Sequence, residues 1–124
     1  MILVDTSVWV DHLRLSHTAL VRLLENDQVL THAFVVGEIA CGNLSHRETI
    51  LSLMDSLPSA IQASHHETRL FIEHAALMGR GLGFIDVHLL VSARLTPDAL
   101  LWTQDRRLHT AAEAFSLAWQ PPPG

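Results

Sequence analysis

Two short apolar runs in this chain are each followed by an aspartate and then by a helical pattern. The first run, residues 2–4, leads directly into Asp5, and the second, residues 99–103, leads to Asp105. Apolar runs of this length beside helical segments are typical of strands buried on both faces of a parallel sheet. The pattern therefore predicts an α/β fold in which strands alternate with helices.

The rest of the chain continues the alternation. Three weaker runs are expected to add strands, which gives a roughly five-stranded, mainly parallel sheet; they are residues 28–32, 60–63 and 116–119. Helices are expected over residues 8–15, 17–26, 33–41, 47–57, 67–78, 87–95 and 106–114. Right-handed crossovers would place these helices on both faces, as a three-layer α/β/α domain. Functional groups in such sheets collect beyond the carboxyl ends of the strands.

The bulk composition suits one soluble domain over residues 1–124, with a frayed Pro-rich tail at 121–124. The hydrophobic content of 48% argues against disorder, and no apolar run reaches the length of a membrane span. A membrane is therefore not an expected partner. The single cysteine, Cys41, has no partner for an internal disulfide and is expected to pack as a small hydrophobic residue, which fits a cytoplasmic location.

The charge balance excludes a simple basic nucleic-acid-binding surface. The chain has 13 acidic residues against 8 basic ones, and all of the basic residues are arginines. A net charge of -5 would repel phosphates. A metal-dependent nuclease is the exception, because its site requires carboxylates and the bound cation reverses the local field.

Four carboxylates stand out. Asp5, Asp86 and Asp105 each lie near a predicted helix start, so each either caps that helix or projects into a crevice at the sheet edge. Glu38 lies in the apolar stretch AFVVGEIACG and is expected to be largely buried. A buried glutamate needs a cation, either an arginine or a metal ion.

Together, four acids in one crevice would repel one another, and a hard divalent ion such as Mg²⁺ or Mn²⁺ would remove the conflict. Such an ion also activates water and binds phosphate oxygens, which is the chemistry of phosphodiester hydrolysis. Ser7 and Thr103 either orient the metal ligands or bond locally to the backbone. Arg106 and Arg107 either contact substrate phosphate, which we favour, or pair with nearby acids.

Four segments resemble the signature blocks of the PIN domain, and more closely those of VapC-type toxins from bacterial type II toxin–antitoxin systems; they are VDTSVWVDHL, VVGEIACGNL, GFIDVHLLVSA and LWTQDRRL. The resemblance covers residues 2–118. It implies that Asp5, Glu38, Asp86 and Asp105 form a quartet that binds Mg²⁺ or Mn²⁺, supported by the hydroxyls of Ser7 and Thr103. It also implies an endoribonuclease toxin that cuts structured RNA, often tRNA or rRNA. The implied partners are a cognate VapB-type antitoxin and a second copy of the chain, in a homodimer and in a heterotetramer or larger complex with the antitoxin.

Several alternatives stay open. One is a housekeeping PIN-domain nuclease without a toxin role, and another is a non-catalytic PIN-like RNA-binding module, which would be expected to lack one or more of the acids. A haloacid-dehalogenase-like phosphatase needs a second aspartate where this chain has Ser7. The glycine-rich residues 79–83 lack the GK[ST] ending of a phosphate-binding loop. His88 is interpreted as a packed residue in preference to an RNA contact.

Overall fold

Three short parallel strands form the centre of the computed structural model, which describes residues 1–123. β1 (Ile2–Val4) is the middle strand, and it pairs with β2 (Val29–Leu30) on one side and β3 (Leu100–Trp102) on the other. The register aligns Leu3 with Leu30 and with Leu101. All three residues of β1 are buried, which explains why the strand is purely aliphatic.

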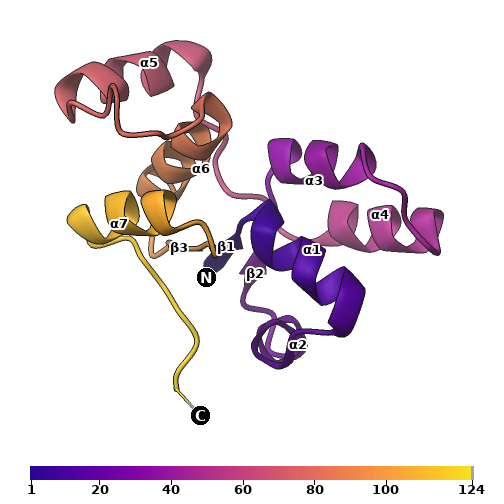
Figure 1. The fold of residues 1–124 in the computed structure, drawn as a ribbon. Helices are drawn as coiled ribbons and strands as arrows, with labels where there is room; N and C mark the ends of the chain where they lie inside the picture. Colours follow the sequence, from indigo (N-terminus) through magenta and orange to yellow (C-terminus); the bar gives the residue numbers. More distant parts are fainter. Residues whose placement is uncertain (124) are drawn as a thin grey trace.

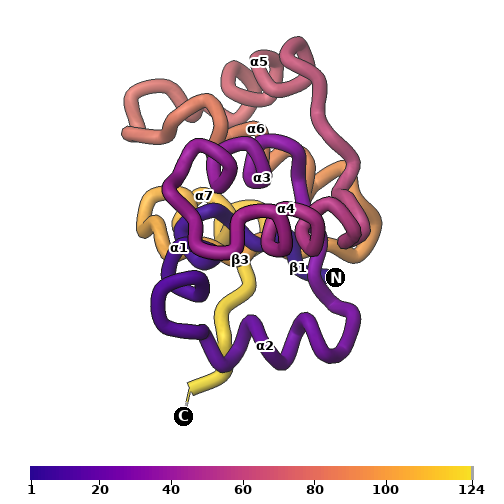
Figure 2. Tube along the Cα trace, turned by 90° about the vertical axis from the view of Figure 1, so that its right-hand side faces the viewer, coloured from indigo at the N-terminus to yellow at the C-terminus, as the bar shows by residue number. Residues whose placement is uncertain are grey.

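Seven helices in the described residues surround this sheet. The helices α1 to α4 lie on the β2 side of the molecule, whereas α5 to α7 lie on the β3 side, as Figures 1 and 2 show. Their bounds are α1 (Thr6–Leu15), α2 (Thr18–Glu25), α3 (Ala33–Ala40), α4 (Arg47–Ser56), α5 (His65–His74), α6 (Phe84–Leu95) and α7 (Arg106–Ala114). The sheet therefore has helical cover on both sides, which leaves its strand ends as the place where polar side chains can meet.

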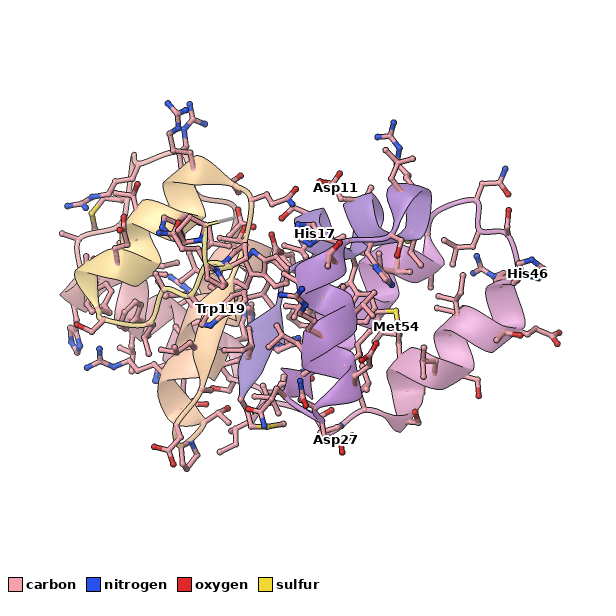
Figure 3. The ribbon with its side chains drawn as sticks, turned by 90° about the horizontal axis from the view of Figure 1, so that it is seen from below. Asp11, His17, Asp27, His46, Met54 and Trp119 are labelled. Atoms are coloured by element: carbon pink, nitrogen blue, oxygen red, sulfur yellow. The ribbon has the colours of Figure 1, made fainter. Side chains whose placement is uncertain are left out.

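The hydrophobic core joins the two sides of the molecule through the sheet. Helix α6 is buried at every position from 87 to 93, which makes it the central helix on the β3 side. On the opposite side, Met54 of α4 is completely buried and points toward the interior, as Figure 3 shows. Near the end of the chain, the ring of Trp119 lies 4.9 Å from that of Trp102, centroid to centroid, and so packs edge-on against the last residue of β3.

The predicted α/β class with a parallel sheet is confirmed, but the number of strands is not. Within residues 1–123, the expected strands at 60–63 and 116–119 are reduced to isolated parallel bridges, Thr31 with Ser59 and Leu101 with Ala118. Beyond the first bridge, the N–H of Ile61 bonds to the hydroxyl of Thr96, and that of Ala63 bonds to the hydroxyl of Ser92. Side chains of α6 and its C-cap thus replace the ladder that a fourth strand would have formed.

Three local expectations are also corrected. Helix α5 begins at His65 and ends at His74, before the expected 78, because the chain turns at Ala76, which has a φ of 52°. Helix α6 begins at Phe84, three residues before the expected start. Cys41 is exposed rather than packed, because it is the C-cap of α3 at the surface.

The end of the chain has little regular structure. Residues 121–123 lie outside any helix or strand, and Gly124, the last residue of the expected frayed tail, lies outside the described residues. None of the helices in residues 1–123 combines the length and apolar character that crossing a bilayer requires.

Candidate active site

Asp5 follows β1 directly and is held there by the sheet. Its N–H donates to the carbonyl of Trp102 at 2.9 Å, so the backbone pairing with β3 continues one residue past the strand. The side chain is only 6% exposed, and its Oδ2 accepts hydrogen bonds from Ser7 Oγ (2.8 Å) and Thr103 Oγ1 (2.7 Å). Although Asp5 occupies the N-cap position of α1, its side chain makes no capping bond. The capping interpretation of this carboxylate is therefore wrong.

The two hydroxyls that bind Asp5 are themselves oriented by the backbone. Ser7 Oγ accepts from the N–H of Gln104, and Thr103 Oγ1 accepts from the N–H of Asp105, both at 3.0 Å. Each hydroxyl therefore takes one backbone donor and points its own proton toward the same carboxylate oxygen. This arrangement joins the ends of β1 and β3 through the Asp5 carboxylate.

Asp105 combines a capping role with a free oxygen. It is the N-cap of α7, where its Oδ1 accepts from the N–H of Leu108 at 3.0 Å. The capping interpretation is correct for this oxygen. Within residues 1–123 the second oxygen, Oδ2, makes no hydrogen bond, and the residue is exposed.

The negative charges of the other three acids act on the carboxyl group of Asp86. Asp86 lies in the first turn of α6, where its Oδ2 accepts from the N–H of Gly83 at 3.1 Å. Burial raises the pKa of its carboxyl above the usual value, and the Gly83 N–H opposes that rise. The negative charges of three other acids raise this pKa further, namely Asp5, Asp105 and Glu38. Asp86 therefore shares one electrostatic field with the rest of the predicted quartet.

Glu38 also acts on Asp86, but from an exposed position and not from the buried one expected. It is exposed, so the inference that it is a buried glutamate in need of a cation is wrong. Helix α3 buries Val35 and Ile39 on one side but leaves its small residues and Glu38 open on the other. The Oε1 of Glu38 accepts from Thr6 Oγ1 at 2.8 Å, and no arginine in residues 1–123 pairs with it. Thr6, a neighbour of Asp5, is a functional candidate that the sequence reasoning missed.

We name these four residues, Asp5, Glu38, Asp86 and Asp105, the acidic cluster. Their side chains offer only oxygen ligands, and the hydroxyls around them are also oxygens, which suits a hard cation such as Mg²⁺ or Mn²⁺. Within residues 1–123, no three acids, histidines or cysteines lie close enough together to hold an ion directly. An ion bound here would therefore take only one or two carboxylates directly and keep several of its waters, as Mg²⁺ commonly does.

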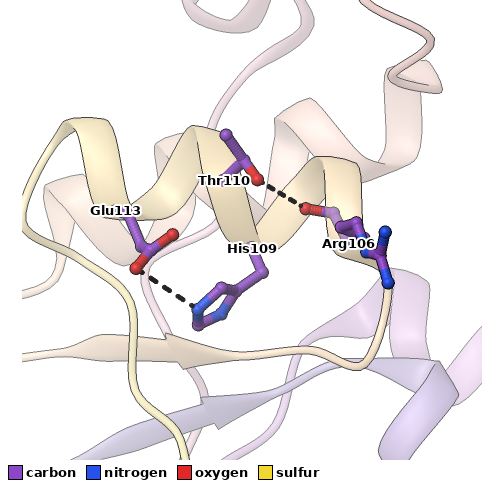
Figure 4. Close-up of polar contacts among 4 residues, drawn as sticks. All are labelled: Arg106, His109, Thr110 and Glu113. Atoms are coloured by element: carbon purple, nitrogen blue, oxygen red, sulfur yellow. Dashed lines mark hydrogen bonds and ion pairs between the residues drawn. The ribbon is translucent and has the colours of Figure 1, made fainter.

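Arg106 and Arg107 follow Asp105 in the first turn of α7, and both are exposed. The alternative that they pair with neighbouring acids is not observed, because the one ion pair among residues 1–123 joins His109 and Glu113. Figure 4 shows that pair on the flank of α7, with the carbonyl of Arg106 bonded to Thr110. The two guanidinium groups therefore remain available to an anion.

His88 does not face the acidic cluster. It is 3% exposed, its Nδ1 lies 3.2 Å from the hydroxyl of Thr68, and its ring packs edge-on against Phe34 and Phe84. The interpretation of His88 as a packed residue is therefore correct.

The architecture and the acidic strand ends define the class of protein. The family profile of the PIN domain matches residues 2–114, and the chain belongs to the PIN-domain family. Among curated proteins it is similar to Ribonuclease VapC32 of Mycobacterium tuberculosis, in the strains CDC 1551 / Oshkosh and ATCC 25618 / H37Rv. In both cases the identity is 41% over 118 residues, which cover 95% of this chain and 95% of the relative. The resemblance to VapC-type PIN domains that the four segments indicated is confirmed.

Proposed function

We propose that this protein is a divalent-metal-dependent endoribonuclease of the VapC type. The observation that supports it most is that the negative charges of Asp5, Asp105 and Glu38 all act on Asp86. Hydrogen bonds link the segments that carry three of these acids: Thr6 reaches Glu38, and Thr103 joins the Asp5 carboxylate to the Asp105 backbone. The two VapC32 relatives are named as ribonucleases, which supports the same reaction class.

The acidic cluster would hold Mg²⁺ or Mn²⁺, with Ser7 and Thr103 as supporting hydroxyls. When bound, such an ion lowers the pKa of a water and neutralises charge on the phosphate under attack. The protein's own contribution is placement: the sheet and two hydroxyls fix Asp5, while the α7 cap fixes Asp105. In the hydrolysis, water adds its hydroxyl to phosphorus and gives its other proton to the solvent, while one ester P–O bond breaks and the leaving oxygen takes up a proton to become a ribose hydroxyl.

We also propose that the substrate phosphate is bound by Arg106 and Arg107, which lie next to Asp105 and have no acidic partner within residues 1–123. Guanidinium groups suit this task because they match two phosphate oxygens at once. A tRNA or rRNA is the expected target.

The biological role that fits best is that of a cytoplasmic toxin held inactive by a VapB-type antitoxin. A basic segment of the antitoxin would be attracted to the acidic cluster and would compete there with the metal. A homodimer, and a heterotetramer or larger complex with the antitoxin, are part of this proposal. The alternatives are a housekeeping PIN nuclease and a non-catalytic RNA-binding module; the presence of all four acids argues against the second.

The reaction is tested with purified protein and labelled total tRNA or rRNA. We expect cleavage with Mg²⁺ or Mn²⁺, loss of cleavage in EDTA, and recovery when the ion is restored in excess. Asp55→Asn serves as a control, because Asp55 is an exposed carboxylate on α4, outside the acidic cluster. Full-rate cleavage in EDTA would contradict the metal-dependent mechanism.

The toxin role needs a separate test in cells. Expression of the chain alone should arrest growth, and co-expression of the small gene next to its own should restore it. Normal growth despite a folded, active nuclease would favour the housekeeping alternative.

A further inference from the structure

A hollow of about 270 Å³ lies between α7 and the loop that precedes α6. Arginines dominate its polar lining. The residues around it are Arg80, Leu82, Arg106, Arg107, Thr110, Ala111 and Ala114, and we name it the basic hollow. Arg80 comes from the loop and was not singled out by the sequence, whereas Arg106 and Arg107 come from α7.

These three arginines have no anionic partner within the described part of the chain, where the one ion pair is His109 with Glu113. Two of the other arginines have structural contacts. Arg47 donates to the carbonyls of Ala40 and Gly42 at the end of α3, and Arg94 lies 5.5 Å from two phenylalanine rings. Three of the eight arginines of a chain with net charge -5 therefore gather, unpaired, around one depression. Like charges placed together favour an anionic ligand.

The hollow is a shaped feature rather than a loose surface patch. The Arg107 side chain lies on the backbone of Gly81, so closely that a Cβ at position 81 would sit 2.9 Å from Arg107 Cδ and Nη1. Gly81 also has a φ of +77°, a conformation that side-chain-bearing residues rarely adopt. On the other wall, Thr110 Oγ1 donates to the carbonyl of Arg106, so the hydroxyl holds the helix and the guanidinium groups remain the donors (Figure 4).

Both walls of the basic hollow continue into the acidic cluster. Helix α7 is capped by Asp105, which immediately precedes Arg106. The loop that carries Arg80 ends at Gly83, whose N–H donates to Asp86. A nucleic-acid strand with one phosphate at the acidic cluster therefore has a neighbouring part of its backbone next to the arginines.

We propose that the basic hollow binds the sugar-phosphate backbone of the RNA substrate beside the scissile phosphate, with Arg80 and Arg107 as its principal contacts. This rests on the proposed nuclease function and extends it with a substrate-binding site built from two separate segments of the chain. Arg107 belongs to the LWTQDRRL segment, whereas Arg80 lies outside it and is brought to α7 by the fold.

Binding is measured by fluorescence anisotropy with a labelled short single-stranded RNA in EDTA, over a range of roughly 50 to 200 mM KCl. Each phosphate contact to a single strand contributes roughly 0.7 to the slope of log affinity against log salt. The double variant Arg80→Gln/Arg107→Gln is expected to bind about tenfold more weakly, with a slope lower by roughly 1.4. Arg22→Gln/Arg69→Gln removes the same charge from exposed positions on α2 and α5, and it should match the wild type.

Two further measurements distinguish the loss of charge from the loss of the guanidinium shape, and a weaker binding step from slower chemistry. Arg107→Lys keeps the charge but loses the planar guanidinium, so it should retain the salt slope of the wild type while binding more weakly. In the Mg²⁺ cleavage assay, the Arg80→Gln/Arg107→Gln variant should raise KM for the RNA by roughly tenfold, as loss of a binding contact does.

Equal RNA affinity and equal salt slope in the two double variants would contradict the proposal that the basic hollow binds RNA, even if the wild type cleaves RNA normally. Absence of cleavage by the wild type, together with an arginine-dependent salt slope, would instead contradict the nuclease function and leave the hollow as an RNA-binding site. If poly-glutamate competed for the hollow more strongly than the RNA, the ligand would be an acidic protein segment and the RNA assignment would be wrong.

Discussion

The acidic cluster and the buried histidines of the same protein differ in how their titratable groups are satisfied. Between α3 and α6, His32 and His88 lie with Thr68 and Ser92, and we name these four residues the histidine cluster. The N–H of Phe34 donates to His32 Nδ1 at 3.0 Å, so the other ring nitrogen, Nε2, donates to Ser92 Oγ at 3.0 Å. Burial, followed by the nearby His88, lowers the pKa of His32 to about 4.

The two clusters differ in whether their polar atoms all have hydrogen-bond partners. Both ring nitrogens of His32 have partners, and burial keeps the ring neutral. In the acidic cluster, Asp105 leaves one oxygen without a hydrogen bond among residues 1–123, and burial, followed by the charges of the other acids, raises the pKa of Asp86. A buried group with all its partners stabilises the fold, whereas gathered like charges with free oxygens call for a ligand.

The largest expected effect is on catalysis. Asp5→Asn keeps the size of the side chain and can still accept both hydroxyl protons, but it removes the negative charge. We expect RNA cleavage in Mg²⁺ to fall by about a thousandfold, in the range typical of lost metal or acid–base chemistry. The measurement is a single-turnover rate, and a circular dichroism spectrum checks the fold. A rate close to that of the wild type would remove Asp5 from the mechanism.

Replacement in the histidine cluster should act on stability. His32→Ala leaves the N–H of Phe34 without its acceptor and opens a cavity beside Ser92. The free energy of unfolding should fall by about 2–3 kcal/mol, measured by urea denaturation. A loss below roughly 0.5 kcal/mol, the size of an ordinary surface change, would contradict the structural role.

The same histidine predicts a pH dependence with a definite sign. Because the pKa of His32 is about 4 in the folded state, against the ordinary value of 6.5 in the unfolded chain, the unfolded chain binds more protons between these values. Its contribution to stability is therefore complete above pH 6.5 and is lost as the pH falls toward 4. The stability of His32→Ala should depend less on pH in this window, and parallel curves for the two proteins would count against the assignment.

The hydroxyl of Thr103 tests how the strand ends are joined. Thr103→Val preserves the shape of the side chain but removes the proton that Asp5 Oδ2 accepts at 2.7 Å. We expect Mn²⁺ affinity to fall by about 10- to 100-fold, which is the usual loss for a residue that orients a metal ligand. Isothermal titration measures this directly; an unchanged affinity would show that Ser7 alone orients the carboxylate.

The smallest expected effect is on stability, and its sign differs between the acidic cluster and the histidine cluster. The pKa of Asp86 is raised in the folded state, so the native protein binds more protons than the unfolded chain just above pH 3.8, and stability falls as the pH rises through this region. Asp86→Asn should therefore stabilise the metal-free protein at neutral pH, by less than about 1 kcal/mol because the group is partly exposed. A lower Tm in EDTA would contradict the repulsion between the acids.

The sequence predicts the ends of β1 and β3 well, because an apolar run followed by aspartate depends only on local pattern. What each carboxylate binds could not be predicted in the same way. Asp5 and Asp105 have the same local context, yet Asp105 caps α7 while Asp5 binds two hydroxyls, one of them from Thr103 just after β3. That difference depends on a contact between residues 98 positions apart.

Glu38 was expected to belong to the site because it was expected to be buried, and that reason is wrong. Its apolar neighbours suggested burial, but Val35 and Ile39 are enough to pack α3, and Glu38 lies on the open side. The weak strand expected at 60–63 failed for a related reason: hydroxyls of Ser92 and Thr96 take the backbone N–H groups that a ladder would have used. Side-chain competition of this kind leaves no periodic signal in a sequence.

Titration of the metal-free protein with Mn²⁺ tests the central claim most directly. The wild type and the Asp55→Asn control are expected to bind the ion with the same affinity, and Asp5→Asn and Asp86→Asn are each expected to bind it at least about tenfold more weakly. Equal Mn²⁺ affinity in all four proteins, or no binding by the wild type, would contradict the account that the acidic cluster is a cation site.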